Sequence, residues 1–563
     1  MKKRLPIWLV TAIAVIAFAA GFLVDRHYMN SWSGPDVSDS KVKTVLDLIN
    51  EQYVDTVNFD NLMEKSIPLI LRGLDPHTGY FDARDTKITR NHPDGVIPDL
   101  GVVLLIFNDT LHVECIVPAG PSDIAGIRPG DRIVKIDGEP TANIKKTSGE
   151  IYKRLSGPNG SKVTLSVERH GSRKVLDFAV TRNRIIKRTL DSYYMIDKNT
   201  GYVKVNQFER NTHEEFVHAL SQLQAQGAKR FLIDLRGNGG GYMETAVLMA
   251  NEFLQAKRPI VTTRGKRRQY SHTYNSDGKG KFQNIELAVL IDEHSASASE
   301  IFAGALQDND RALIVGRRSF GKGLVQDNFI LPDSSIIRLT VARYYTPSGR
   351  CIQKNYKHLE TRYYEDELLE RLKHGELFNR DSLRIDKSQA FTTQHGRTVY
   401  GGGGIIPDIF VGRDTTGISQ YYVDVENAGL LQRFAFAYCE KNRSTLEQMS
   451  DYKQFLRVAP SDDALINDFA DFAASKGIAP RWYYINLSHD VIVTNIKAMI
   501  ARNTFGNQAF YPIMNRNDKT VQTALKALNK HKAVFPITEA LNPKSISQRR
   551  GGSSNLFHHL FMR

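Results

Sequence analysis

The stretch "ELAVLIDEHSASASEIFAGALQD", residues 286–308, decides the fold class of this chain. It opens with an apolar run of the length of a buried strand, and it closes with apolar residues at helical spacing. Three serines, Ser295, Ser297 and Ser299, alternate with alanines between these two parts. A strand that runs through a short turn into a helix is the building unit of an α/β protein.

The segments on either side repeat this unit. "RFLIDLRGNGGG", residues 230–241, is an apolar strand that leads into a glycine-rich loop, and "ETAVLMANEFL", residues 244–254, has a helical pattern. "RALIVGRRSFGKGLVQ", residues 311–326, adds further strands. We therefore predict an α/β core over residues 183–412, with a charged excursion at 351–395 and strand ends that converge on one edge of the sheet.

Residues 95–182, within a predicted domain of 91–182, alternate like short strands separated by glycine, proline and aspartate. Within them, "PSDIAGIRPGDRIVKIDGEP", residues 121–140, reads as a short helix, a turn, a strand and a hairpin. This order resembles the central stretch of PDZ domains. The resemblance implies that a peptide C-terminus binds at Leu100, Gly101 and Val102, where backbone N–H groups take the carboxylate and the peptide adds a strand. A β-module with an unused groove is the alternative.

The N-terminus indicates the compartment. Basic residues at positions 2–4 precede residues 5–24, which carry no charge and are long enough to cross a bilayer. We favour a retained inner-membrane anchor, with the catalytic part in the periplasm, over a cleaved signal peptide, because the apolar run is long for a signal peptide. The predicted parts are an anchor (1–30), a stalk and helical segment (31–90), the PDZ domain (91–182), the core (183–412), a C-terminal helical extension (413–540) and a basic tail (541–563).

Composition excludes several classes of function. The net charge is +14, but the basic residues are spread along the chain without interleaved aromatic residues, so we expect no nucleic-acid partner. The cysteines are Cys115, Cys351 and Cys439, whose isolation excludes a disulfide framework and a cysteine metal site. We expect neither a metal nor another cofactor.

A nucleophilic serine needs a base for its proton and donors for the developing oxyanion. The N-terminus of the helix after the serine run supplies N–H groups and a favourable dipole. Helix phase alone does not choose among the three serines, which could all be turn and capping residues. Ser299 fits the N-cap of the helix.

Two residues compete as the base. His294 is close in sequence, but neighbours in one turn seldom face each other across a site. Lys322 stands between two glycines beside apolar strands, where desolvation would lower its pKa, and Gln326 could fix its rotamer. The alternatives are a surface lysine and an exposed strand glutamine. The glycines of 237–241 suit an oxyanion hole, whereas a phosphate loop would require a Gly-Lys-Ser/Thr that is missing.

Together these motifs resemble one family. "LDPHTGYF" (74–81), the PDZ-like stretch, "DLRGNGGG" (234–241), "SASASEIFAGALQD" (295–308) and "SFGKGLVQ" (319–326) occur in the order found in the carboxyl-terminal processing peptidases, or tail-specific proteases. The resemblance covers about residues 40–412. It implies a ClpP/crotonase-like α/β core with an inserted PDZ domain, here flanked by the helical segments at both ends.

The resemblance also implies residue roles. It makes Ser297 the nucleophile, Lys322 the general base and Gln326 the partner of the lysine. The oxyanion hole would combine the N–H of Ala298 with that of Gly239 or Gly240. The implied function is a serine endopeptidase that recognises the free C-terminal ends of exported proteins. A catalytically silent PDZ scaffold and a crotonase-like acyl-CoA enzyme are the alternatives. The extension could dimerise, shape access or bind a partner, so a homo-oligomer stays open.

Overall fold

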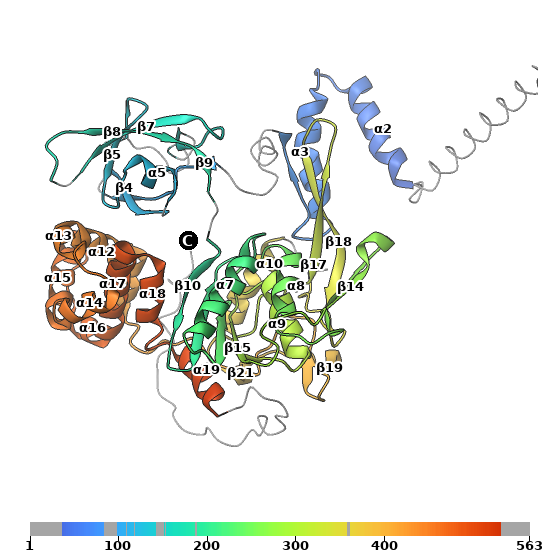
Figure 1. Cartoon of the computed structure of the whole chain (residues 1–563). Helices are drawn as coiled ribbons and strands as arrows, with labels where there is room; N and C mark the ends of the chain where they lie inside the picture. Colours follow the sequence, from blue (N-terminus) through green and yellow to red (C-terminus); the bar gives the residue numbers. More distant parts are fainter. Residues whose placement is uncertain are drawn as a thin grey trace, which may run out of the picture. The chain divides into compact units, whose positions relative to one another are not determined.

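The computed structural model describes residues 37–83, 98–107, 110–117, 119–141, 151, 154–169, 171–185, 188–356 and 361–530. The chain divides into two compact units, Met1–Gly73 and Leu74–Arg563. In the first unit, helices α2 (Val37–Gln52) and α3 (Phe59–Arg72) are described, and the side chain of Asn58 caps α3 by accepting the N–H of Asn61 (Figure 1).

The expectation of a transmembrane protein needs correction. Across the described parts of the chain, no helix has the length and apolarity needed to span a bilayer, which takes about 20 apolar residues. The longest described helix, α17 (His489–Phe505), has 17 residues. Residues 5–24, on which the expectation rested, lie outside the described residues, as does the predicted basic tail 541–563.

The predicted PDZ segment forms an antiparallel sheet. Its strands follow the order β3 (Val102–Phe107), β4 (Thr110–Ile116), β5 (Arg132–Ile136), β7 (Lys162–Glu168) and β8 (Leu176–Thr181), with β6 (Glu139–Pro140) paired to β5 and the short helix α5 (Pro121–Ala125) beside β8. Alternate residues of β7 and their neighbours, such as Val163 and Leu165, build one core. Strand β3 pairs only with β4 among the described strands and so lies at the edge of the sheet. A short ladder of β2 (Pro98–Asp99) and β9 (Asn183–Arg184) closes the segment.

The core is a largely parallel sheet. Its order is β10 (Leu190–Met195), β11 (Thr200–Val205), β12 (Arg230–Asp234), β15 (Glu286–Ile291), β16 (Leu313–Gly316) and β21 (Ile409–Phe410), and only the β10–β11 pair is antiparallel. One face packs on α7 (Thr212–Ala225), α8 (Met243–Asn251) and α9 (Ala298–Asp308). Because β12 and β15 are parallel neighbours, the loops that follow them meet at one edge, as the sequence predicted.

The other face of this sheet is covered by the last described helix, α19 (Lys519–Asn529). Val521, Ala524 and Leu528 of α19 are buried in one cluster with sheet residues such as Leu232 and Leu290. At the start of α19, the Asp518 carboxylate accepts a hydrogen bond of 2.7 Å from the guanidinium of Arg236. The C-terminal extension therefore supplies part of the core, which its helical pattern alone does not reveal.

The rest of the extension packs as a helical cluster. Its helices are α11 (Gln420–Asn427), α12 (Leu430–Lys441), α13 (Arg443–Leu446), α14 (Tyr452–Val458), α15 (Asp462–Ser475), α16 (Trp482–Leu487), α17 and α18 (Asn507–Met514). The apolar face read from the sequence is observed: Leu465, Phe469 and Ala473 are buried and Phe472 packs against them.

A second sheet flanks the core. Strand β18 (Ile336–Tyr345) is its centre and pairs with β17 (Leu324–Ile330), β13 (Pro259–Gly265) and β1 (Gly79–Phe81), while β14 (His272–Asn275) pairs with β13. A 3-10 turn, η1 (Arg268–Tyr270), links β13 to β14. The charged excursion holds α10 (Thr361–Lys373), η2 (Arg380–Ser382), η3 (Lys387–Gln389) and the hairpin of β19 (Ala390–Thr392) with β20 (Thr398–Tyr400).

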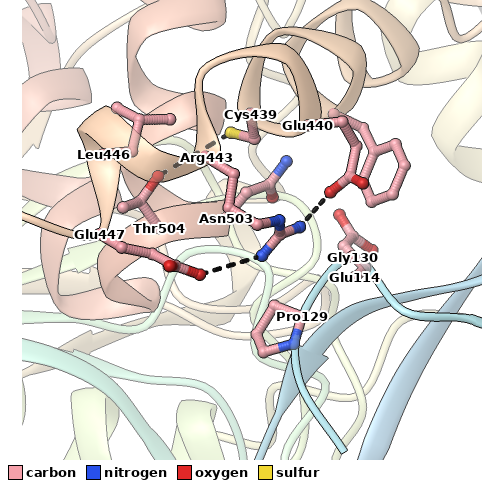
Figure 2. Close-up of a pocket in the computed structure, with 11 residues that line it drawn as sticks. Glu114, Pro129, Gly130, Cys439, Glu440, Arg443, Leu446, Glu447, Asn503 and Thr504 are labelled. Atoms are coloured by element: carbon pink, nitrogen blue, oxygen red, sulfur yellow. Dashed lines mark hydrogen bonds and ion pairs between the residues drawn. The ribbon is translucent and has the colours of Figure 1, made fainter. Parts of the chain in front are cut away.

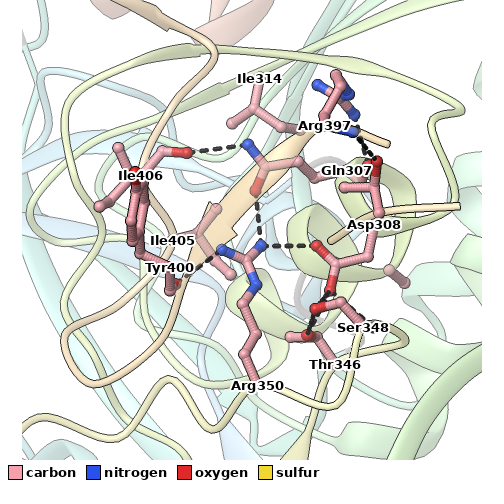
Figure 3. Close-up of polar contacts among 12 residues, drawn as sticks. Gln307, Asp308, Ile314, Thr346, Ser348, Arg350, Arg397, Tyr400, Ile405 and Ile406 are labelled. Atoms are coloured by element: carbon pink, nitrogen blue, oxygen red, sulfur yellow. Dashed lines mark hydrogen bonds and ion pairs between the residues drawn. The ribbon is translucent and has the colours of Figure 1, made fainter. Parts of the chain in front are cut away.

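A buried polar network fixes the C-terminal end of α9 (Figure 3). The guanidinium of Arg350 is fully buried and donates to Asp308 Oδ1 and Gln307 Oε1, each at 2.7 Å, and to the carbonyl oxygen of Tyr400 at 2.9 Å. The other oxygen of Asp308 accepts the hydroxyls of Thr346 and Ser348. The network thus ties α9 to the chain on both sides of the excursion.

Arg350→Ala is expected to lower the free energy of unfolding by about 3–5 kcal/mol, because it leaves the Asp308 carboxylate buried without its counter-charge. Denaturant titration followed by fluorescence measures the change. Lys373→Ala, which removes an exposed ion pair with Glu370, is the control and should leave the transition unchanged. Equal transitions for Arg350→Ala and wild type would contradict this assignment.

Candidate active site

Ser297 has an unusual backbone. It is the N-cap of α9, and its φ of 55° with ψ of −113° lies where side chains other than glycine are strained. Such strain costs about 1–3 kcal/mol and persists only where the surroundings hold it. It turns the chain sharply from the end of β15 into α9 and places Ser297 at the N-terminal end of a helix, where N–H groups are unpaired.

The other two serines hold this turn in place. Both are fully buried, and their hydroxyls donate to the glycine loop: Ser295 to Leu235 O at 2.8 Å and Ser299 to Asn238 O at 2.9 Å. Ser297 alone is partly exposed. The expectation that Ser299 caps the helix is wrong, because the chain enters α9 one residue after Ser297 and Ser299 already lies inside it.

The glycine loop lies directly against Ser297. A Cβ at Gly240, whose φ is +104°, would stand 2.8 Å from the Ser297 Cβ and 2.7 Å from the Ala296 carbonyl oxygen. The N–H of Ala296 donates to Asn238 O at 3.0 Å and fixes this approach. The N–H of Gly240 already donates to Asn238 Oδ1 at 2.8 Å, so Gly239, which is exposed, is the better of the two candidate oxyanion donors.

Lys322 is half-buried on the loop that precedes β17. Burial lowers the pKa of Lys322 from its ordinary value, and the nearby Arg338 cation lowers it further, while the Glu300 and Asp75 carboxylates act in the opposite direction. Gly321, at φ +90°, lets this loop pack against Gly404, whose backbone nitrogen would be 3.1 Å from an added Cβ. This is the desolvated setting that a lysine base requires.

Gln326 lies on β17, and its amide nitrogen donates to Thr340 Oγ1 at 3.4 Å. Its role beside Lys322 therefore stays a prediction. His294 is exposed, and its backbone N–H donates to Asp292 Oδ1 at 3.1 Å. The same Asp292 oxygen accepts the N–H of Gly237 at 2.9 Å, so Asp292 anchors the glycine loop.

Glu300, which is not among the residues predicted from the sequence, joins the two halves of the site. Its side chain is fully buried, and its carboxylate accepts the N–H groups of Ser297 (2.9 Å), Lys322 (2.9 Å) and Gly321 (2.7 Å) and the Ser319 hydroxyl (2.5 Å). Burial raises the pKa of Glu300 to about 7, against these hydrogen bonds. The Ser-x-x-Glu spacing of a capping box was the signal that could have revealed it.

Tyr344 makes a second connection between the same two segments. This side chain of β18 is 1% exposed, and its hydroxyl contacts the carbonyl oxygens of Lys322 and Ser297, the latter at 3.2 Å. The nucleophile candidate and the base candidate are therefore brought together by contacts of their own backbones.

The PDZ-like residues form a separate surface. Leu100 is buried, and its N–H donates to Asp99 Oδ1 at 2.5 Å, while Gly101 has a φ of +73°. Val102 begins the edge strand β3 and pairs with Ile116 on its inner side. An edge strand can accept an added peptide strand, but the Leu100 N–H is not available as a carboxylate donor in this conformation.

A cavity of about 220 Å³ lies elsewhere, lined by Glu114, Pro129 and Gly130 and by helical-extension residues such as Arg443 and Asn503 (Figure 2). None of the predicted catalytic residues lines it. Within the described residues, no group of His, Cys, Asp and Glu side chains could hold a metal ion.

Comparison with known proteins identifies the family. The sequence model of Peptidase family S41 matches residues 199–359, a PDZ domain model matches residues 112–169, and a family of unknown function matches residues 421–506. The carboxy-terminal-processing protease of Bartonella bacilliformis is 35% identical over 313 residues, covering 55% of this chain and 71% of the relative. The carboxyl-terminal-processing protease of Synechocystis is 33% identical over 332 residues, covering 54% and 76%.

Among solved structures, the photosystem II D1 C-terminal processing protease aligns with a TM-score of 0.34 and 28% identity, covering 55% of this chain and 83% of that one. The fold and the relatives define a serine peptidase with a PDZ domain. The chain belongs to the carboxyl-terminal-processing proteases of peptidase family S41.

Gly240→Ala is expected to lower kcat by at least about 100-fold, because the added methyl group would displace Ser297 from its position against the glycine loop. Gly239→Ala is the matched control, since its Cβ would meet no atom within 4 Å and its N–H is kept. Hydrolysis of an unstructured protein substrate measures both. Similar losses in the two variants would contradict the different roles assigned to these glycines.

Glu300→Gln is expected to lower kcat by about 100-fold, since both carboxylate oxygens accept two hydrogen bonds each and an amide keeps only one such oxygen. Either the N–H groups of Ser297 and Lys322 at Oε2, or the Gly321 N–H and Ser319 hydroxyl at Oε1, would then face an NH2 group. Glu293→Gln is the control: Glu293 is equally buried on the same segment but is paired with Arg317, so its loss should affect stability more than kcat. Steady-state kinetics on folded protein separate the two. A wild-type kcat in Glu300→Gln would show that this carboxylate does not hold the site together.

Proposed function

We propose that this protease cleaves its substrates with a Ser-Lys dyad formed by Ser297 and Lys322. The observation that carries the proposal is the strained, partly exposed Ser297, tied through Glu300 to the backbone of Lys322. The hydroxyls of the two other serines are used in buried structural hydrogen bonds, and the His294 side chain is exposed. The same observations argue against a catalytically silent scaffold.

The chemistry follows from these positions. The neutral amine of Lys322 takes the hydroxyl proton of Ser297 while the serine oxygen attacks the carbonyl carbon of the scissile peptide bond. The N–H groups of Ala298 and Gly239 stabilise the oxyanion at the N-terminus of α9. The lysine ammonium then gives its proton to the leaving amine, and an acyl-enzyme remains. Water, deprotonated by the same amine, hydrolyses the ester and restores Ser297.

We further propose that the PDZ domain recruits the substrate by its free C-terminus. The open edge of β3, which begins at Val102, and the positive φ of Gly101 just before it support this reading, whereas the Leu100 N–H would first have to leave Asp99. From the sequence we keep the expectation that substrates are exported proteins and that the core is of ClpP/crotonase-like type. The relatives named above are carboxyl-terminal-processing proteases, which agrees with recognition of chain ends.

Ser297→Ala and Lys322→Ala are expected to lower cleavage of an unstructured protein with an apolar C-terminus by at least about 1,000-fold, because each removes a reacting group. His294→Ala is the control and should keep most of the activity. If Lys322→Ala cleaved normally and His294→Ala did not, histidine would be the base.

The pH dependence of kcat gives an independent test. The rate should rise with pH as Lys322 loses its proton, and it should level off below the ordinary lysine range, because burial lowers the pKa of Lys322. A rate that follows an ordinary histidine titration would contradict the dyad.

A further inference from the structure

We propose that His77 is a positioning residue of this active site, carried against Lys322 by the turn Asp75–Thr78. The inference rests on the proposed dyad and assigns a place in it to "LDPHTGYF" (74–81), a motif that the mechanism above does not use. This segment lies far from the nucleophile and the base in sequence.

The turn is folded by one carboxylate. Asp75 Oδ1 accepts the N–H groups of His77 at 2.8 Å and Thr78 at 2.9 Å, and Asp75 Oδ2 accepts the Thr78 hydroxyl at 2.6 Å. Asp75 and Thr78 are both buried. These bonds set the direction in which His77 leaves the turn, since an aspartate that accepts two consecutive N–H groups fixes the backbone between them.

Strand pairing brings the turn to the base. Directly after the turn, β1 pairs with β18, with Gly79 opposite Arg338. The Thr340 N–H on β18 donates to the Thr78 hydroxyl at 3.1 Å, and Thr340 is also the partner of Gln326 on β17. The turn therefore lies across one strand from β17, at the end of the sheet where Lys322 precedes that strand.

The pKa shifts of His77 and Lys322 agree with this placement of the turn. Burial lowers the pKa of His77 to about 4, and the cations of Lys322 and Lys354 act in the same direction, against the Asp75 carboxylate. Asp75 in turn raises the pKa of Lys322, as does Glu300, whereas Arg338 lowers it. At neutral pH the His77 imidazole is consequently uncharged.

A neutral imidazole suits a lysine base. One ring nitrogen can accept a hydrogen bond from the lysine in its amine and its ammonium form, so the ring can hold the side chain through proton transfer without adding a charge. The ring also excludes water from the amine, and this desolvation favours the neutral, basic form. His77 thus acts through Lys322 and does not itself exchange a proton with the substrate.

The test compares His77→Ala with Asp75→Asn. His77→Ala opens the amine to water, so the pH profile of kcat should move to higher pH and kcat at pH 7 should fall about tenfold, with KM unchanged. Asp75→Asn keeps an oxygen for the two N–H groups but removes the charge that raises the pKa of Lys322, so the profile should move to lower pH. His77→Gln, a neutral polar replacement, should lie between wild type and His77→Ala, and it replaces His77→Ala if that variant does not fold.

A second readout does not depend on proteolysis. In the Ser297→Ala background, the pH at which the Lys322 amine becomes reactive toward an acylating reagent is followed by mass spectrometry. The same opposite shifts are expected for the two variants, with His294→Ala as the unshifted control. Loss of kcat without a shift, or shifts of the same sign, would overturn the proposal. If the dyad itself were wrong, Lys322→Ala would keep full activity. The labelling experiment measures the Lys322 amine directly, so it tests the role of His77 separately from that outcome.

Discussion

The buried carboxylate of Glu300 is the interaction on which the active site depends. A buried carboxyl group needs hydrogen-bond donors, and here they are backbone N–H groups of Ser297, Gly321 and Lys322 together with the Ser319 hydroxyl. The carboxylate is satisfied only when the α9 turn and the lysine loop are adjacent. Separating the two segments would leave this buried group without hydrogen-bond partners, so its burial favours the arrangement in which the proposed nucleophile and base are adjacent.

The strain at Ser297 is sustained from the other side of the turn. Hydrogen bonds from Ser295 and Ser299 to the glycine loop hold the residues before and after it, so the serine between them cannot relax. Those bonds exist because β12 and β15 are parallel neighbours whose following loops meet at one edge. Behind α9, the Arg350–Asp308 network fixes the far end of the helix. Sheet, helix and loops thus form one rigid support.

Local patterns predicted a large part of this arrangement. Strand, glycine loop and serine turn were visible in residues 230–241 and 286–308, because strand periodicity and glycine clusters are properties of neighbouring residues. Contacts between distant segments were not visible. Helix α19 packs on β11, β12, β15 and β16, which precede it by about 200 to 330 residues, and nothing in its helical pattern identifies these strands as its partners. Ser299 was misassigned because a serine before a helix fits a cap equally well at either of two positions.

The same distinction explains why we propose a lysine as the base where a histidine stands closer in sequence. His294 is next to the turn but its side chain is exposed. Lys322 is brought in by the fold, and its surroundings oppose one another: burial and Arg338 favour the neutral amine, whereas Glu300 and Asp75 favour the ammonium. A base must be neutral when it accepts the proton and charged immediately afterwards. Opposing influences of this kind limit how far the pKa of Lys322 is lowered, so that the amine can both accept a proton and hold it until it is passed on. Segments from distant parts of the chain supply these influences at one amine.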